Sequence, residues 1–354
     1  MSLDLEALQT FPKISLHDHL DGGLRPQTII ELAAAIDYPL PADNAADLGR
    51  WFVESANSGS LERYLETFDH TIAVMQTAPN LVRVAKEFVA DLAVDGVIYG
   101  EARWAPEQHL QAGLSKAQAI EAVRDGLADG MAACRAGGHD IEVRQLLTAM
   151  RQTSDPTPDT AQLALRYRRE GVAGFDIAGR EKGFPAARFL DSFRLLRQQN
   201  AYYTIHAGEA DGCQSIWEAV QVCGANRIGH GVAITEDIQR DECGRDALGD
   251  FAAYLLNEQI PFEMCPTSNV QTGAVASISE HPISRLDRLR FRVTVNPDNR
   301  LMSATTLTRE FALLADAFDY SMDDVRRLGI NAAVSVFAPY EARKALVQRI
   351  ASAD

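Results

Sequence analysis

Short runs rich in apolar and β-branched residues alternate along the chain with longer segments in which apolar residues recur at helical spacing. The short runs predict strands, and the longer segments predict helices. Eight runs fit this description: residues 13–16, 96–104, 141–147, 172–177, 201–205, 227–229, 260–264 and 290–295. Alternating strands and helices indicate parallel pairing, and eight such α/β units close most economically into a (β/α)8 barrel, the TIM barrel. A doubly wound open sheet is the alternative.

The connection between the first two strands is unusually long. It covers about 70 residues, so it must contain helices of its own. Within it, apolar residues at i, i+3, i+4 and i+7 share one helical face: Leu61, Tyr64, Leu65 and Phe68. These extra helices either pack against the barrel or form a lid over its mouth, giving an apolar wall to a flat ligand. No repeat, low-complexity tract or long linker divides the sequence, so we expect a single domain over residues 1–354.

The chain is strongly acidic. It carries 34 Lys and Arg residues against 49 Asp and Glu residues, which gives a formal charge of −15. Binding to the phosphate backbone of DNA or RNA needs a basic surface, so we expect no nucleic-acid partner. The charge is compatible with a small neutral substrate.

Other features of the sequence concern its location. No apolar run reaches the roughly 18 residues of a membrane span, and the N-terminus lacks the basic and apolar regions of a signal peptide. The five cysteines are odd in number and form no CxxC pair, which disfavours a disulfide framework and fits a reducing cytosol. We therefore expect a cytoplasmic protein with no membrane partner. The sequence leaves the oligomeric state open.

The first strand ends in two histidines with one residue between them. Residues i and i+2 of a strand point to the same side, so His17 and His19 project together. Asp21 continues this face if the strand geometry extends that far. Two imidazoles on one side are able to hold a divalent metal, with Asp21 as a possible third ligand. The alternative is a polar strand end with two surface histidines.

Similar side chains follow three later strands. His206 ends the fifth strand and Glu209 lies three residues beyond it, His230 stands between two glycines after the sixth, and Asp298 follows the eighth. Each alone is compatible with a turn or a helix cap. In a closed barrel, however, the C-terminal strand ends meet at one mouth, where active sites of this fold lie. Imidazoles and a carboxylate gathered there suit zinc or a similar metal. Glu209 is close enough to act on a substrate bound at the same metal.

The remaining histidines show no such clustering, and we expect structural or surface roles for them: His70, His109, His139 and His281. The number of metals is suggested by the fourth strand. Barrel proteins that hold two metals often bridge them with a modified lysine at the end of strand 4. Here that strand runs through residues 175–179 without a lysine, and the next is Lys182. This favours a single metal.

These motifs together resemble the adenosine deaminase family of metal-dependent hydrolases. The specific matches are His17-Asp18-His19-Leu20-Asp21-Gly22, Thr204-Ile205-His206-Ala207-Gly208-Glu209, Arg227-Ile228-Gly229-His230-Gly231 and Asn296-Pro297-Asp298-Asn299. Weaker matches are Tyr99-Gly100-Glu101-Ala102-Arg103, Met150-Arg151, Asp176-Ile177-Ala178-Gly179 and Cys265-Pro266-Thr267-Ser268-Asn269. They run from about residue 12 to residue 310 in the family's order. The resemblance implies the same (β/α)8 fold.

The resemblance implies a metal site and a catalytic pair. One Zn²⁺ per chain would be bound by His17, His19, His206 and Asp298, and it would lower the pKa of a bound water to supply hydroxide. His230 would orient that water and help to deprotonate it. Hydroxide would attack purine C6 while Glu209 donates a proton to ring N1, so the pKa of Glu209 should be raised by its surroundings.

The resemblance also implies substrate contacts. Gly179 would offer its backbone N–H to purine N3, and Asp21 would bond a ribose hydroxyl. Asn299 stands where many members have an acid that contacts purine N7, and its amide donates to N7 without needing a proton. Arg180 also stands where an acid is common. If it reached the pocket it would favour a substrate with a carboxylate, but we expect it to face solvent.

The implied reaction is hydrolytic deamination of adenosine and 2′-deoxyadenosine to inosine and 2′-deoxyinosine with release of ammonia. An alternative keeps the chemistry and changes the substrate to adenine or aminofutalosine. The chain shows no Lys/Arg-rich loop that would select a phosphate, so a free nucleoside is favoured. A non-enzymatic nucleoside-binding protein and a barrel hydrolase acting on an ester or peptide are further alternatives.

Overall fold

A computed structural model describes residues 3–152 and 157–353 of the chain. Within these residues, eight parallel strands form two four-stranded sheets. The first has the order β1 (Lys13–His19), β2 (Val97–Trp104), β3 (Glu142–Met150) and β4 (Val172–Ala178). The second has the order β10 (Val293–Val295), β9 (Phe262–Met264), β6 (Arg227–His230) and β5 (Thr204–Ala207).

Two isolated parallel bridges join the sheets into a barrel. Phe175 pairs with Tyr203 between β4 and β5, and Asp18 pairs with Asp298 between β1 and the end of β10. The order β1-β2-β3-β4-β5-β6-β9-β10 therefore returns to β1, and the eight predicted strands are all present. The (β/α)8 barrel is confirmed, and the open doubly wound sheet is wrong.

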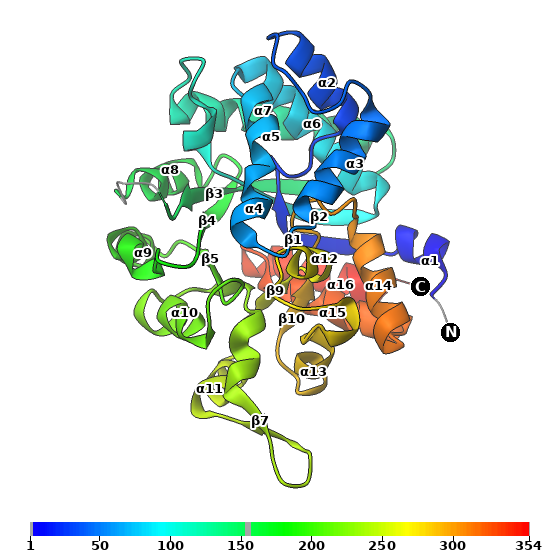
Figure 1. Ribbon diagram of the computed structural model, residues 1–354, viewed down its shortest axis with the longest axis vertical. Helices are drawn as coiled ribbons and strands as arrows, with labels where there is room; N and C mark the ends of the chain where they lie inside the picture. Colours follow the sequence, from blue (N-terminus) through cyan, green and yellow to red (C-terminus); the bar gives the residue numbers. More distant parts are fainter. Residues whose placement is uncertain (1–2, 153–156, 354) are drawn as a thin grey trace.

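Helices surround the strands, as Figure 1 shows. In chain order they are α1 (Leu5–Thr10), α2 (Pro26–Ala34), α3 (Ala45–Ala56), α4 (Leu61–Glu66), α5 (Phe68–Val74), α6 (Ala78–Val94), α7 (Lys116–Ala136), α8 (Asp159–Tyr167), α9 (Leu190–Gln198), α10 (Cys213–Trp217), α11 (Asp250–Glu258), α12 (Pro266–Gln271), α13 (Ile283–Arg288), α14 (Leu307–Phe318), α15 (Met322–Ser335) and α16 (Tyr340–Ala351). Short 3₁₀ segments lie at Pro106–His109, Ala186–Phe189, Val232–Asp237 and Ile278–Glu280, and Glu218–Val222 is a π-helix. None of the described helices is long and apolar enough to cross a membrane.

Local sequence explains the two longest helices. The side chain of Thr77 caps α6, and Ser115 caps α7 in a capping box with Gln118. Gly126 and Gly130 of α7 face α6, and a Cβ at either position would lie 2.8 Å or less from atoms of that helix. Two glycines one turn apart therefore allow these helices to pack closely.

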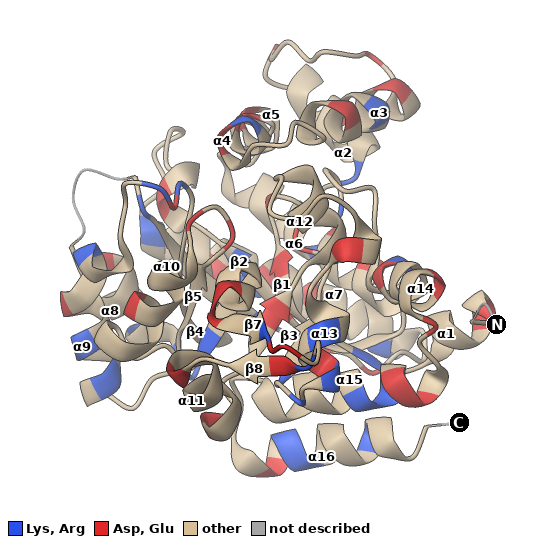
Figure 2. Cartoon of the chain, turned by 60° about the horizontal axis from the view of Figure 1, so that its bottom comes forward, with Lys and Arg blue, Asp and Glu red and all other residues tan. Residues whose placement is uncertain are grey.

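The long connection after β1 contains α2 to α5 and leads into α6. These helices stand above one end of the barrel in Figure 2. The apolar face expected over residues 61–68 is present, but the helix is interrupted at Thr67, whose hydroxyl donates to the carbonyl of Tyr64 at 2.7 Å. Two short helices, α4 and α5, therefore replace one continuous helix.

An antiparallel hairpin of β7 (Ile238–Arg240) and β8 (Asp246–Leu248) protrudes at the bottom of Figure 1. The sequence analysis did not predict it, because its strands are only three residues long and form no continuous apolar run. Its turn is stabilised by Asp241, whose carboxylate accepts the backbone N–H groups of Cys243 and Arg245 at 2.9 and 2.8 Å.

Candidate active site

The side chains predicted to form the site converge at the C-terminal end of the barrel. Ligand atoms of four buried residues lie within 4.8 Å of one another, and these residues are His17, His206, His230 and Asp298. They come from β1, β5, β6 and the loop after β10. His19 joins the group through its Nε2, which lies 3.3 Å from Oδ1 of Asp298. The barrel thus brings together residues that are nearly 300 positions apart.

His17 shows why this group fits a cation. Its Nδ1 lies 2.9 Å from Oε2 of Glu263, and its Nε2 lies 3.2 Å from Oδ1 of Asp298. Burial alone would raise the pKa of Glu263, but Arg103 and Arg227 outweigh that effect and hold the pKa well below its usual range. Glu263 is therefore ionised and accepts a hydrogen bond from Nδ1–H, so the lone pair of Nε2 faces a carboxylate oxygen. Nε2 is buried without a hydrogen bond, and a metal ion between the two acceptors would satisfy both.

His206 is held in the same way. Its Nδ1 lies 3.1 Å from Asp176, so its Nε2 also directs a lone pair into the site. Arg103 donates to Asp176 at 3.1 Å and to Glu263 at 2.7 Å, and thereby links the two carboxylates behind the histidines. Burial lowers the pKa of His206 well below its usual range, which keeps the imidazole in the neutral form that binds metals. A set of neutral imidazoles and one carboxylate suits zinc among the divalent metals.

Two residues of the group have unusual backbone conformations. His230 has a φ of 63° and Asp298 a φ of 61°, a left-handed region that residues with a Cβ rarely adopt. Backbone hydrogen bonds to strand β1 stabilise Asp298. The N–H of Asp298 donates to the carbonyl of His17 at 3.0 Å, and the carbonyl of Asp298 accepts from the N–H of His19 at 2.8 Å. Strained backbone of this kind concentrates at functional sites.

A cavity of about 100 Å³ lies beside the histidines. The residues expected to bind substrate all line it, together with the expected acid: Asp21, Gly179, Glu209 and Asn299. Helices α4 and α5 supply its apolar wall through Leu61, Tyr64, Leu65, Phe68 and Ile72. The face predicted for the long connection therefore covers the site itself.

Glu209 has the environment of a protonated acid. Its side chain is buried, and its Oε2 lies 3.6 Å from Nε2 of His230. Burial raises the pKa of Glu209 well above its usual range, and the negative charges of Asp298 and Glu181 raise it further. A carboxyl group in this environment keeps its proton to a higher pH than a free glutamic acid does, as a proton donor requires.

Two other polar side chains of the cavity have atoms without partners. Oδ1 of Asp21 and Oδ1 of Asn299 are buried and make no hydrogen bond within the protein. Burial also raises the pKa of Asp21 to about 7. Leaving buried polar atoms unpaired is costly, so these residues favour a ligand with polar groups of its own.

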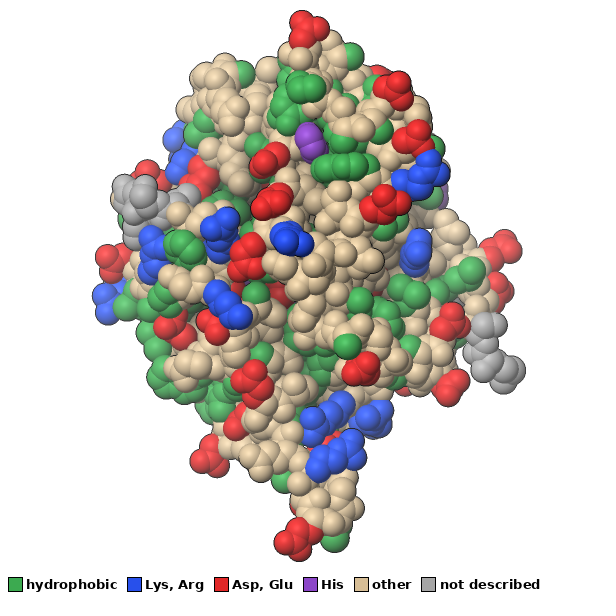
Figure 3. All heavy atoms as spheres, viewed as in Figure 1, with side chains coloured by type: hydrophobic (Ala, Val, Ile, Leu, Met, Phe, Trp, Pro, Cys, Tyr) green, Lys and Arg blue, Asp and Glu red, His purple; other side chains and the backbone are tan. Residues whose placement is uncertain are grey.

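The two basic residues that follow β4, Arg180 and Lys182, lie outside this cavity. Arg180 is exposed and does not line it, as expected. Lys182 is also exposed and lines an outer cleft of about 850 Å³ next to the cavity. Figure 3 looks at the same face as Figure 1, and basic side chains gather there in one place above the protruding hairpin. Arg240, Arg285 and Arg288 are among the residues that line the outer cleft.

One of the four histidines expected to be structural or at the surface, His281, is buried and contacts the site through Asn269. The backbone N–H of Ile283 donates to His281 Nδ1 at 3.1 Å, so neutral His281 carries its proton on Nε2. That nitrogen lies 3.1 Å from Oδ1 of Asn269, which also accepts the N–H of Cys265 at 3.3 Å. The amide nitrogen of Asn269 therefore donates to Nδ1 of His230 at 3.0 Å. Neutral His230 consequently carries its proton on Nε2, the nitrogen that faces Glu209.

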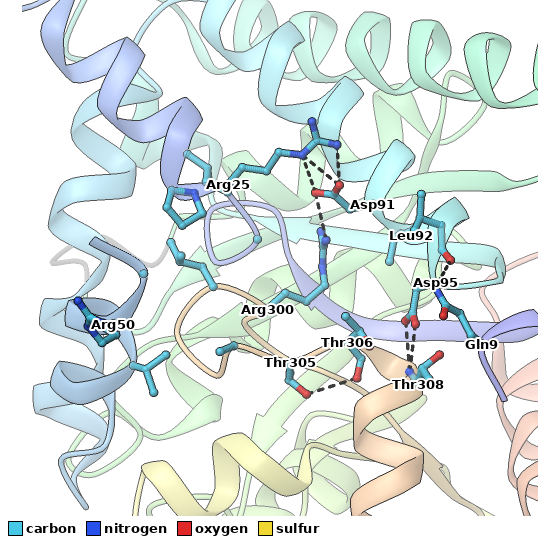
Figure 4. Close-up of a pocket in the computed structure, with 18 of the residues that line it drawn as sticks. Gln9, Arg25, Arg50, Asp91, Leu92, Asp95, Arg300, Thr305, Thr306 and Thr308 are labelled. Atoms are coloured by element: carbon cyan, nitrogen blue, oxygen red, sulfur yellow. Dashed lines mark hydrogen bonds and ion pairs between the residues drawn. The ribbon is translucent and has the colours of Figure 1, made fainter. Parts of the chain in front are cut away.

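Another contact that the sequence analysis missed involves Arg300. Its Nε donates to Asp18, between the two histidines of β1, at 2.9 Å. On its other side Arg300 lies 3.7 Å from Asp91, which is paired with Arg25 at 2.6 Å. Figure 4 shows Arg25, Asp91 and Arg300 at a second cleft, of about 710 Å³. This chain of ion pairs ties the β1 end and the loop after β10 to α6.

Comparisons with known proteins agree with this geometry. A family model described as adenosine deaminase matches residues 12–353. The adenosine deaminase of Mycolicibacterium gilvum is 54% identical over 349 residues, which cover 98% of this chain and 96% of the relative. Adenosine deaminase 1 of Streptomyces coelicolor is 53% identical over 346 residues, which cover 98% of this chain and 87% of the relative.

Solved structures share the whole fold. The crystal structure of Arabidopsis ADAL complexed with IMP matches with a TM-score of 0.83 at 27% sequence identity, and the match covers 98% of both chains. The fold, the converging histidines and the extent of sequence identity all point the same way. The chain belongs to the adenosine deaminase family.

Proposed function

We propose that this protein hydrolyses adenosine and 2′-deoxyadenosine to inosine and 2′-deoxyinosine and releases ammonia. Relatives that are slightly more than half identical over nearly the full chain carry the name adenosine deaminase. The observation that carries the proposal is the buried Glu209, whose pKa is raised, in one cavity with the converging histidines and Asp298. A protonated acid beside a metal site is the pair that hydrolysis of an aromatic amine needs.

The proposed metal site consists of His17, His19, His206 and Asp298, which would hold one zinc ion. The facing acceptors of His17 and Asp298 support it, as does the neutral state of His19 and His206. When bound, zinc supplies Lewis-acid activation of a water molecule near neutral pH. The absence of a lysine at the end of β4 supports a single ion.

Two residues would handle protons. Glu209 would donate its proton to ring N1, which draws electron density from the ring and makes C6 accept a nucleophile. His230 would orient the attacking water through its Nε2–H. In the tautomer deduced above Nε2 carries the proton, so His230 has no free lone pair there with which to deprotonate this water.

Three residues would select the substrate. Asp21 would bond a ribose hydroxyl, the backbone N–H of Gly179 would donate to purine N3, and the Asn299 amide would donate to N7. Gly179 has a φ of 92°, and a Cβ there would lie 2.2 Å from the side-chain oxygen of Gln152, so only glycine fits this position. The described lining of the cavity includes no Lys or Arg, which favours a nucleoside over a nucleotide.

Adenine and aminofutalosine remain alternatives with the same chemistry. Free adenine has no ribose, so it would leave the buried Oδ1 of Asp21 without a partner. A nucleoside partner satisfies that atom and is the proposed substrate. We further propose that the protein acts in the cytoplasm on this small molecule, with no nucleic-acid or membrane partner.

A substrate panel tests the function directly. Adenosine, 2′-deoxyadenosine, adenine, aminofutalosine and AMP are each followed by ultraviolet change and ammonia release, with metal analysis on the same sample. We expect turnover of the two nucleosides and one zinc per chain. No turnover of any aminopurine by zinc-loaded protein would contradict the proposal, and two metals per chain would contradict the single site.

A further inference from the structure

The loop that carries Glu209 is held from outside the cavity by a second carboxylate. Glu181 follows β4 and is only 4% exposed. It accepts the backbone N–H groups of four consecutive residues, Gly208 at 2.5 Å, Glu209 at 3.1 Å, Ala210 at 2.6 Å and Asp211 at 3.0 Å. Successive N–H groups turned toward one anion form a rigid, charge-assisted contact. The hydroxyl of Ser215 also donates to Glu181, at 2.6 Å.

The start of the same loop is held by a cation. Arg151, fully buried at the end of β3, donates a short hydrogen bond from Nη2 to the carbonyl of His206. Its Nη1 donates to the carbonyl of Phe184 at 3.0 Å. The loop from His206 to Asp211 therefore has its first carbonyl bound by a cation and its later amides bound by an anion.

The loop sequence suits this arrangement. Gly208 has a φ of +68°, and a Cβ there would lie 2.5 Å from the side chain of Ile216. Glycine is therefore required where the chain turns its amides toward Glu181. Glu181 itself does not line the cavity and is not among the proposed metal or substrate contacts.

We propose that Glu181 is a positioning residue, which fixes the Glu209 loop so that the Glu209 carboxyl meets purine N1. The inference rests on the proposed role of Glu209 as the acid. Proton transfer needs a heavy-atom separation of about 2.6 to 3.2 Å, and a misplacement of about 1 Å costs roughly 100-fold in rate. A carboxylate that holds four amides of this loop restricts such a displacement.

The test begins with Glu181→Gln, which keeps the size of the side chain and removes its charge. The new amide group can no longer accept from all four N–H groups and places donors against donors. We expect kcat for adenosine to fall by about 10- to 100-fold. The KM, the Kd of the product inosine and the zinc content per chain should stay within about threefold, because none of those contacts is made by Glu181.

The matched control is Glu218→Gln. Glu218 also accepts a backbone N–H, that of Ala187 at 2.9 Å, but it does not contact the Glu209 loop. Its kcat should stay within about twofold of the original. Equal losses in the two variants would overturn the proposal.

The double variant Glu181→Gln/Glu209→Gln separates positioning from general damage. If Glu181 acts only through Glu209, the double variant should have the kcat of Glu209→Gln alone. A further 10- to 100-fold loss in the double variant would overturn the proposal, as would a Glu181→Gln enzyme with an unchanged kcat or with lost inosine binding.

Ser215→Ala keeps the proposal testable if Glu181→Gln fails to fold. It removes one bond to Glu181 and leaves the carboxylate in place. In the otherwise unaltered protein we expect Ser215→Ala to lower kcat by about two- to fivefold, and in the Glu209→Gln background we expect no further loss. An unchanged kcat of Ser215→Ala in the otherwise unaltered protein would overturn the proposal. Full activity of Glu209→Gln by itself would instead contradict the proposed acid, whatever Glu181 does.

Discussion

Three imidazoles at the barrel mouth, those of His17, His206 and His230, each have one nitrogen bound by a buried neighbour, and that contact decides which nitrogen carries a proton. Glu263 and Asp176 take the Nδ1–H groups of His17 and His206 and leave Nε2 free for a metal. Asn269 does the opposite to His230, because its amide donates to Nδ1 and leaves the proton on Nε2. Chemically identical side chains are thereby prepared as ligands in one case and as a donor in the other.

The role of Asn269 predicts the effect of Asn269→Asp. A carboxylate accepts from Nδ1–H instead of donating to it, so His230 should change to the tautomer with Nδ1 protonated. Placing the proton on the wrong nitrogen of a catalytic histidine costs several orders of magnitude in other hydrolases, and we expect kcat to fall by about 100-fold or more. Nitrogen-15 NMR of the zinc-loaded protein reports the tautomer independently of activity.

Asn226→Asp is the control for this substitution. Asn226 accepts the N–H of Tyr203 at 3.0 Å, and an aspartate is able to make the same contact. The rate should therefore stay within about twofold. A His230 signal with Nδ1 already protonated in the unaltered protein would contradict the tautomer deduced from Asn269.

The environment of Glu209 predicts a pH dependence. Because burial and neighbouring negative charges raise its pKa, the proton-donating form is present below the raised pKa and is lost as pH increases through it. The value of kcat/KM should therefore decline on the alkaline side of a profile measured from about pH 5 to pH 10. Glu209→Gln should lower kcat by about 100-fold or more and remove that decline. An unchanged alkaline limb in Glu209→Gln would show that another group titrates there.

Some of these residues are visible in the sequence, and others are not. His17 and His19 stand out because their spacing puts them on one face of a predicted strand, and His206 and Asp298 follow predicted strands. Glu263 and Asp176 lie inside short apolar strands, where a buried acid is unusual. That is a signal, but it does not identify the histidine partner, which is 246 positions away in the case of Glu263.

Helices α4 and α5 present a problem of access. They form one wall of a cavity of about 100 Å³ at the site, whereas sites for ligands of drug size usually measure about 300 to 1,000 Å³. A nucleoside therefore needs these helices to move outward, or their side chains to rearrange, before it enters. This supports the prediction that the connection acts as a lid.

Amide hydrogen exchange tests the lid. Saturating inosine should slow exchange across residues 61–74, because the ligand fills the space that these helices cover. Helix α7 lies outside the cavity and should exchange equally with and without inosine. Unchanged exchange in α4 and α5 at saturation would mean that they form a fixed wall.

The elements themselves were predictable to different degrees. All eight barrel strands were located from apolar runs between helical segments, because parallel strands buried on both faces are nearly continuously apolar. The break at Thr67 and the hairpin of β7 and β8 were not predicted. The first depends on a side-chain bond to a backbone carbonyl, and the second on pairing between two segments of only three residues each.

Closure of the barrel places the proposed metal between distant parts of the chain. The ligands come from β1, β5 and the loop after β10, and without a cation the Nε2 of His17 faces a carboxylate oxygen at 3.2 Å. Under the proposed metal site, the barrel mouth would both bind the ion and be held together by it. Folding and metal binding should be coupled.

Metal removal consequently predicts a loss of stability as well as of activity. A ligand at about 1,000 times its Kd that binds only the folded state adds about 4 kcal/mol to the free energy of unfolding. We expect chelation to lower Tm by about 5 °C or more and equimolar zinc to restore both Tm and activity. In Asp298→Ala, which lacks one proposed ligand, zinc should raise Tm much less. Equal responses of Asp298→Ala and the unaltered protein to zinc, followed by calorimetry, would mean that the metal binds elsewhere.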